Sequence, residues 1–250
     1  MLATQANTEA WFGKMAHARE LTRRAMNSAA QHDAQESAAA YEAEEALNEA
    51  ELGYLEQGRA DAKAALRLSS NHDVKDVAML ALARAGDSRA AERMATELGT
   101  AYPEDTLIQN YWLPTVRAAI QLNQGNSARA IDVLQSMGSR ELGQPTAFAI
   151  LMHPVYVRGQ AFLAARKGKE AAAEFQKILD HHGLMQNDPI GALAHLQLGR
   201  AYAMLGKIPE ARGVYEDFLN LWKDADAELP ALKEAKGEYA KLKQSPTLQH

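Results

Sequence analysis

The sequence predicts an all-α protein built as a stack of antiparallel helix pairs, and three observations lead to this fold class. Alanine is abundant along the 250 residues while aromatic residues make up only 6%, and small side chains allow helices to pack closely. No run of β-branched or aromatic residues alternates with a period of two, as strands would require. A pattern of glycine, small residue and apolar residue recurs at nearly constant intervals, which is typical of repeat folds.

The recurring pattern consists of a glycine, a small residue five positions later and an apolar residue a further seven positions on. The intervals between successive small residues are 40, 33, 39, 41 and 40 residues. The glycine suits the left-handed residue that ends a helix. The small residue lies one turn into the next helix, where the two helices of a pair are expected to cross. The small residues of the six copies are Ala18, Gly58, Ala91, Ala130, Ala171 and Ala211.

These marks divide the chain into helix pairs in a fixed order. Gly159 and Gly199, twelve residues before the small residues of the last two copies, are expected at matching close contacts in the first helices of those pairs. A last helix at 228–243 starts near Pro230, which suits a first turn. Its Lys- and Glu-rich side could cap the open end of a single domain spanning 1–250. The start of the chain shows no such cap, so we expect further repeats before it. The expected pairs are 1–30, 35–69, 72–102, 105–138, 147–181 and 190–223.

The sixth pair carries the pattern most completely and resembles the tetratricopeptide repeat (TPR) family, whose repeat is a 34-residue helix–turn–helix. The resemblance implies a TPR-like right-handed superhelix, an α-solenoid. Most intervals here exceed 34, so several connections would carry about five to seven extra residues. Gly58 stands where the family has alanine, which makes the second copy weaker. The matching residues are Leu198, Gly199, Tyr202, Gly206, Ala211, Tyr215 and Phe218.

Longer stretches, at 105–114, 173–181, 191–202 and 221–226, are similar to the TPR-containing C-terminal region of large bacterial serine/threonine protein kinases, as in acidobacteria. This resemblance implies a kinase domain upstream and often a membrane segment between the two. The region itself would then be a soluble fragment, cytoplasmic or periplasmic, of a parent anchored in the membrane. The chain has no Gly-rich phosphate loop, no His-Arg-Asp and no Asp-Phe-Gly, so we expect no enzyme activity from it.

Composition excludes several other classes of site. The chain has no cysteine, which rules out disulfides, thiolate metal sites and a cysteine nucleophile. A net charge of −5 disfavours nucleic acid and anionic lipid, and no apolar run approaches the roughly 20 residues of a membrane span. The neighbours His181 and His182 would point about 100° apart in a helix, and no His-Glu-x-x-His occurs. We therefore expect no metal, no cofactor, no nucleic acid and no membrane contact.

An acidic run in the second pair allows two interpretations. It could receive a basic partner, or it could be the solvated face of a helix. The solvated face is the commoner case and is the one we favour. The run consists of Glu42, Glu44, Glu45, Glu49 and Glu51.

The resemblance to TPR proteins implies that the first helices of the pairs line a concave surface. Positions that advance by three, four and three residues share one face of a helix. On the fourth, fifth and sixth pairs this face mixes aromatic, apolar and hydrogen-bonding groups, as peptide grooves do. The alternative is that long connections or the terminal helix fill the groove. The candidate groove residues are Trp112, Thr115, Leu122, His153, Tyr156, Gln160, Leu163, Leu196 and Arg200.

The sequence therefore predicts a non-catalytic scaffold that binds an extended or helical peptide, or a protein, in its concave face. Two alternatives stay open. The stack could associate with itself and so bring its parent proteins together, or it could be the TPR region of a transcriptional regulator. An enzyme would need an acid–base site that the sequence does not display.

Overall fold

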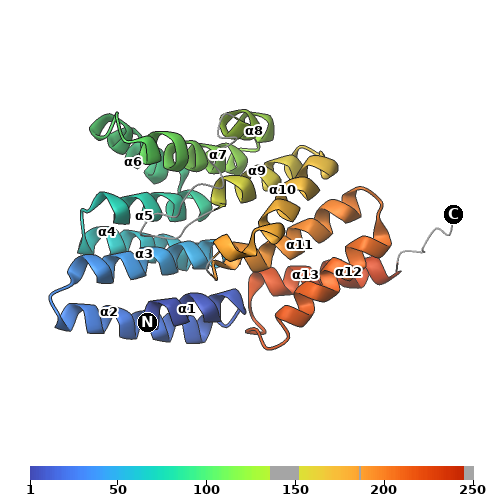
Figure 1. Ribbon diagram of the computed structural model, residues 1–250, viewed down its shortest axis with the longest axis horizontal. Coiled ribbons are helices and arrows are strands. Elements are labelled where there is room, and N and C mark those ends of the chain that lie inside the picture. Colours follow the sequence, from blue (N-terminus) through green and yellow to red (C-terminus); the bar gives the residue numbers. More distant parts are fainter. Residues whose placement is uncertain (136–151, 186, 245–250) are drawn as a thin grey trace.

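The computed structural model describes residues 1–135, 152–185 and 187–244 (Figure 1). Across these residues the chain forms thirteen α-helices and no strand, so the predicted all-α class is confirmed. A π-helical turn, η1 (Ile108–Trp112), leads into α7, and a 3-10 turn, η3 (His182–Leu184), follows α10. In chain order the helices are α1 (Leu2–Trp11), α2 (Met15–Gln31), α3 (Gln35–Leu52), α4 (Leu55–Leu68), α5 (His72–Arg84), α6 (Ser88–Ala101), α7 (Leu113–Asn123), α8 (Ser127–Gln135), α9 (His153–Ala164), α10 (Gly168–Asp180), α11 (Pro189–Met204), α12 (Ile208–Leu221) and α13 (Pro230–Gln244).

Successive helices pack as antiparallel pairs, and each pair packs on the next (Figure 1). The predicted pairs agree with α1/α2, α3/α4, α5/α6, α7/α8, α9/α10 and α11/α12, while α13 is the last helix predicted at 228–243. The expected end of the fourth pair at 138 and start of the fifth at 147 lie outside the described residues. None of the helices in the described part of the chain combines the length and apolar character needed to cross a membrane.

The turn inside each pair has the left-handed residue that the pattern predicted. Gly13, Gly53, Gly86, Gly125 and Gly206 all have φ between +71° and +98°. In the turn between α9 and α10 this conformation falls instead on Arg166, with φ of +61°. The glycine of this copy, Gly168, is instead the first residue of α10, where a Cβ would lie 3.0 Å from the Leu205 side chain.

The small residues of the pattern lie where the two helices of a pair cross. The alanines at 18, 91, 130, 171 and 211 are fully buried. At Gly58 a Cβ would lie only 2.8 Å from the carbonyl oxygen of Ala46, so α3 and α4 approach too closely for alanine. The departure from the family pattern therefore marks a close crossing rather than a weak copy. Gly159 and Gly199 contact Phe175 and Tyr215 in the same manner, as predicted.

The stack curls so strongly that its first pair touches its last. The indole N–H of Trp222 donates to the Trp11 carbonyl at 2.8 Å, and the Asp226 N–H donates to the Gly13 carbonyl at 3.0 Å. The Asp226 carboxylate in turn accepts from the Ala16 N–H at 2.8 Å. Helix α1 also packs against α11, where Gly191 leaves room for the Trp11 ring (Figure 1). The first helices of the pairs consequently face one another across a filled interior.

Replacing Gly58 with alanine should lower the free energy of unfolding by about 1–3 kcal/mol, because the new Cβ would overlap the Ala46 carbonyl oxygen. Gly213→Ala is the matched control, since a Cβ at this exposed glycine of α12 would meet no atom within 4 Å. Alanine there should raise stability by up to about 1 kcal/mol through helix propensity. Urea denaturation measures both variants, and a similar effect at the two positions would contradict the close crossing of α3 and α4.

Candidate functional site

The predicted groove residues fall into two sets in the structure. Trp112, Thr115, His153, Tyr156 and Leu196 are buried, whereas Leu122, Gln160, Leu163 and Arg200 are partly exposed. The expectation of an open groove is therefore wrong for the five buried side chains. The reason is the curl of the stack, which brings α3, α5, α9 and α11 together where an open superhelix would have a concave surface.

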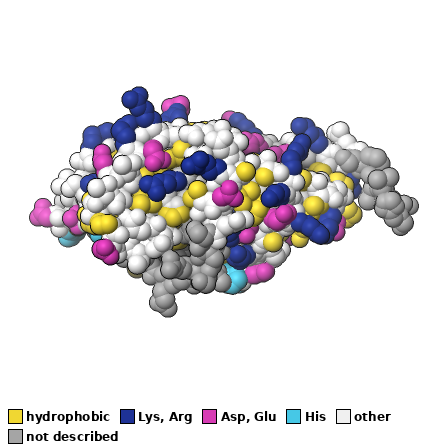
Figure 2. All heavy atoms as spheres, turned by 90° about the horizontal axis from the view of Figure 1, so that it is seen from above, with side chains coloured by type: hydrophobic (Ala, Val, Ile, Leu, Met, Phe, Trp, Pro, Cys, Tyr) yellow, Lys and Arg dark blue, Asp and Glu magenta, His cyan; other side chains and the backbone are white. Residues whose placement is uncertain are grey.

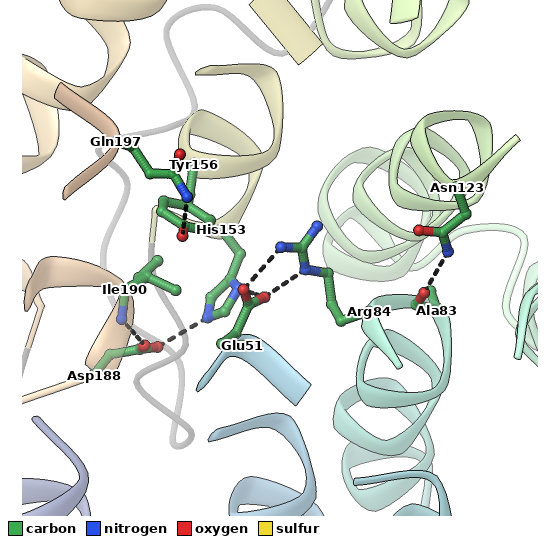
Figure 3. Close-up of polar contacts among 9 residues, drawn as sticks. All are labelled: Glu51, Ala83, Arg84, Asn123, His153, Tyr156, Asp188, Ile190 and Gln197. Carbon is green, nitrogen blue, oxygen red and sulfur yellow. Dashed lines mark hydrogen bonds and ion pairs between the residues drawn. The ribbon is translucent and has the colours of Figure 1, made fainter. Parts of the chain in front are cut away.

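A buried ion pair lies at the centre of this interior (Figure 3). The Arg84 guanidinium, at the end of α5, donates from Nε and Nη2 to the two carboxylate oxygens of Glu51 in α3, at 2.6 and 2.8 Å. The Glu51 side chain is only 1% exposed. Two parallel N–H···O bonds to a carboxylate form the strongest kind of side-chain pair and fix the relative orientation of both groups.

His153 extends this pair to the second half of the chain. The ring is fully buried at the start of α9, with Nε2 2.9 Å from Asp188 Oδ2 and Nδ1 3.7 Å from Glu51 Oε1. The other oxygen of Asp188 accepts from the Ile190 N–H at 3.0 Å and so caps α11. Figure 3 shows Glu51, Arg84, His153 and Asp188 pointing toward one another from four different elements. We call these four residues the central network.

Tyr156 packs beside the central network. Its ring centroid lies 5.8 Å from the Arg84 guanidinium, and its hydroxyl accepts from Gln197 Nε2 at 3.2 Å. Burial raises the pKa of the Tyr156 hydroxyl well above its ordinary value. The side chain therefore joins α9 to α5 and α11 and is not presented to a partner. The imidazole of His153 is buried away from solvent. We therefore interpret the central network as a structural contact that holds the helix pairs together.

Arg200 is held by the terminal helix. Its guanidinium donates to Glu238 at 2.8 and 2.9 Å and to Glu234 at 2.9 Å, both in α13. The Tyr215 hydroxyl also donates to Glu238, at 2.6 Å. At Arg200 the terminal helix therefore occupies the position where a groove partner was expected, which agrees with the alternative that this helix fills the groove.

Comparisons with known proteins give a distant structural similarity. No protein-family model matches the chain, and no curated protein matches it. Among solved structures it is similar to the crystal structure of the P58(IPK) TPR domain. That match has a TM-score of 0.37 and 15% identity, and it covers 93% of this chain and 68% of the other. The assignment of the fold therefore rests on the helix pairs themselves, and the likeness to kinase C-terminal regions stays a prediction.

The acidic run is largely buried rather than solvated, so the interpretation favoured above is wrong. Helix α3 is packed against α2, α4 and α5, which places Glu45 and Glu49 in the interior. Glu49 accepts from Arg19 Nε at 2.7 Å, and Glu45 accepts from the Thr22 hydroxyl at 2.9 Å. Burial, with the nearby carboxylates of Asp61 and Glu45, raises the pKa of Glu49 to about 9 although Arg19 opposes the shift.

An accessible groove lies on the outer side of the stack, over α6, α7 and α8. It consists of two adjoining cavities of about 710 and 460 Å³, which share Glu92 and Gln121. The buried Ile120 of α7 forms part of its floor. Figure 2, which looks onto this side, shows basic side chains gathered beside apolar ones. We call it the α6–α8 groove. Its charged residues are Arg89, Glu92, Arg93, Glu97, Arg117 and Arg129.

Sequence reasoning missed the Arg84–Glu51 pair and the α6–α8 groove. Arg84 ends the otherwise apolar stretch 77–83, and a lone charge in such a stretch is a signal for a buried pair. The arginines of the groove are spread over three helices, so no local pattern collects them. His181 directly follows the end of α10, and its Nδ1 lies 2.8 Å from the Lys177 carbonyl oxygen.

Replacing Arg84 with methionine should lower the free energy of unfolding by about 3–5 kcal/mol, because it leaves the Glu51 carboxylate buried without its partner. Glu51→Gln combined with Arg84→Met should recover part of this loss, since no unpaired charge remains. Arg23→Met is the control, because its pair with Glu20 is exposed and 3.8 Å long, and it should change stability by less than about 1 kcal/mol. If urea denaturation gives Arg84→Met and the control the same loss in the free energy of unfolding, the structural role of the central network is refuted.

Glu49 should make the protein less stable as pH rises from about 4.5 to about 9. Between the unfolded and the folded pKa the native state binds the proton more tightly, so the free energy of unfolding falls with increasing pH. Glu49→Gln should flatten this part of the profile, whereas the exposed Glu20→Gln should leave it unchanged. Urea denaturation across this pH range tests the prediction, and identical slopes for wild type and Glu49→Gln would contradict it.

Proposed function

We propose that this chain is a non-catalytic protein-interaction module whose partner presents an acidic segment to the α6–α8 groove. The observation that carries the proposal is the groove itself, which is accessible and has an apolar floor. Its walls hold four arginines against two glutamates in a chain whose net charge is −5. The planar guanidinium pairs bidentately with carboxylates, so this chemistry favours aspartate and glutamate side chains over basic ones.

The shape of the groove suits a peptide. Its larger cavity, about 710 Å³, falls within the range of roughly 300–1,000 Å³ that ligand sites occupy. Helices α6 and α8 form the two walls and α7 lies between them, so an amphipathic helix could set its apolar face on Ile120. The acidic side chains of such a helix would then meet Arg89 and Arg93 on one wall and Arg129 on the other. This is a helix-in-groove mode of recognition.

We propose further, on the resemblance to bacterial kinase C-terminal regions, that the module belongs to a signalling protein and recruits a partner to it. The support is the sequence likeness alone. The gene upstream of this region provides the test. A Gly-rich loop, His-Arg-Asp and Asp-Phe-Gly encoded there would support a serine/threonine kinase. A DNA-binding or other effector domain in that place would contradict it.

A labelled amphipathic helical peptide with glutamates on its polar face should bind saturably, and the affinity should fall with added salt. The double variant Arg89→Glu/Arg129→Glu should weaken binding by about tenfold or more, because like charges would then face each other. Arg23→Glu/Arg24→Glu is the matched control, since both arginines are exposed, lie outside the groove and give the same change of net charge. Fluorescence anisotropy measures all three proteins, with the glutamine form of the peptide as a second control.

Equal losses in the two double variants would show that net charge, rather than the groove, attracts the peptide, and would refute the proposed site. Absence of binding together with a dimer in sedimentation experiments would favour self-association instead.

A further inference from the structure

The first turn of α5 holds a cluster of metal-binding side chains away from the α6–α8 groove. His72 is the first residue of the helix, and Asp76 lies one turn later on the same face. Asp73 lies beside them, with Oδ1 3.4 Å from His72 Nδ1. One ligand atom from each of the three residues lies within 4.8 Å of the others.

Asp76 is the unusual member of this cluster. Its residue is only 2% exposed, and its Oδ1 is buried without a hydrogen-bond partner among the described residues. His72 Nδ1 is likewise buried and without a hydrogen bond there. A buried carboxylate without a donor costs several kcal/mol relative to water, so native proteins seldom retain one. A positive charge bound between His72, Asp73 and Asp76 would compensate the buried carboxylate.

The surroundings strengthen this requirement. Two further carboxylates, those of Asp73 and Asp105, add negative charge near the buried Asp76 side chain. The acidic side chains are not needed to cap the N-terminus of α5, because Asn71 Oδ1 already accepts from the Asp73 N–H at 2.9 Å. Asp105 is occupied in the same way, since its Oδ1 accepts from the Leu107 and Ile108 N–H groups at 2.9 Å. Neither cap reaches the Asp76 carboxylate.

We propose that His72, Asp73 and Asp76 bind a divalent transition-metal ion, zinc or manganese. An imidazole with two carboxylates is a donor set for these ions, whereas calcium and magnesium prefer oxygen ligands alone. In the tetrahedral geometry that zinc prefers, ligand atoms about 2.0–2.2 Å from the ion lie about 3.3–3.6 Å from one another. From their present spacing of up to 4.8 Å, the ligand atoms would have to move together by up to about 1.5 Å on binding.

The bound ion would fix the start of α5 beside the turn at Asp105 that leads into η1. The same helix ends at Arg84, in the central network. The site is therefore structural, and it does not depend on the partner proposed for the α6–α8 groove. The competing explanation is that Asp76 is a neutral carboxylic acid, which would remove the buried charge without a cation.

Isothermal titration of untagged, chelator-treated protein with zinc chloride tests the proposal, with manganese and magnesium chlorides for comparison. We expect one zinc ion per chain, and weaker or no binding of magnesium. His72→Gln and Asp76→Asn should each weaken zinc binding by at least about tenfold. His17→Gln is the matched control, because His17 Nδ1 also lies 3.4 Å from a carboxylate, Glu9, but belongs to no group of three ligands among the described residues. Its affinity should equal that of the wild type.

Two further readouts separate metal binding from a neutral acid. Cobalt(II) should give visible absorption with the wild-type protein that is lost in Asp76→Asn, and nitrogen and oxygen ligands must be its source because the chain has no cysteine. Zinc should raise the melting temperature of the wild type but not of Asp76→Asn. The proposal is overturned if wild type takes up no zinc saturably, or if His72→Gln and Asp76→Asn bind it like the control. It also fails if Asp76→Asn raises the melting temperature while zinc changes neither protein.

Discussion

The bidentate pair between Glu51 and Arg84 is the contact on which the shape of this protein depends. It joins α3 to α5 inside the curl, and His153 connects it to Asp188 at the start of α11. Each member comes from a different helix pair, so the full set of contacts exists only when the second, third, fifth and sixth pairs surround one centre. The Trp222–Trp11 and Asp226–Gly13 contacts then close the first pair against the last. A repeat fold with short-range contacts thereby gains long-range ones.

This closure decides where a partner can bind. In an open stack the first helices would offer their inner faces, but here Trp112, Tyr156 and Leu196 are used to fill the interior. The second helices keep their outer faces, and between α6 and α8 the floor of α7 stays accessible. The second helices α6 and α8 thus form the walls of the groove, while α7, the first helix of its pair, supplies the floor and Arg117. The curl of the stack explains both results, because it buries His153 on the inner side and leaves the arginines of the groove exposed on the outer side.

Local features of the fold could be predicted from the sequence, because they depend on residues close together along the chain. Gly13 and Gly206 mark turns through their left-handed backbone, and Ala211 marks a crossing through its size. The site could not be predicted in the same way. Whether Tyr156 faces a groove or the interior depends on Arg84 and Gln197, which lie 72 and 41 positions away. Gly58 is a local feature that the sequence pattern misjudged. The close crossing of α3 and α4 that requires a glycine there is recognised only from the position of the Ala46 carbonyl oxygen.

The polar character of the interior is better explained by specificity than by stability. Replacing a buried ion pair by well-packed apolar groups is often neutral or stabilising, so the same helix pairs could be held together by leucines. Apolar contacts, however, tolerate many degrees of curl, since helices that slide by a small amount still bury similar area. The bidentate Arg84–Glu51 pair and the His153–Asp188 contact allow only a small range of curvature. Any opening of the curl would separate these groups and leave them buried or half-buried without partners. Only a narrow range of curvature keeps all four residues within reach of one another. In that sense the central network selects the closed form from a family of stacks that the alanine-rich helix faces alone would permit.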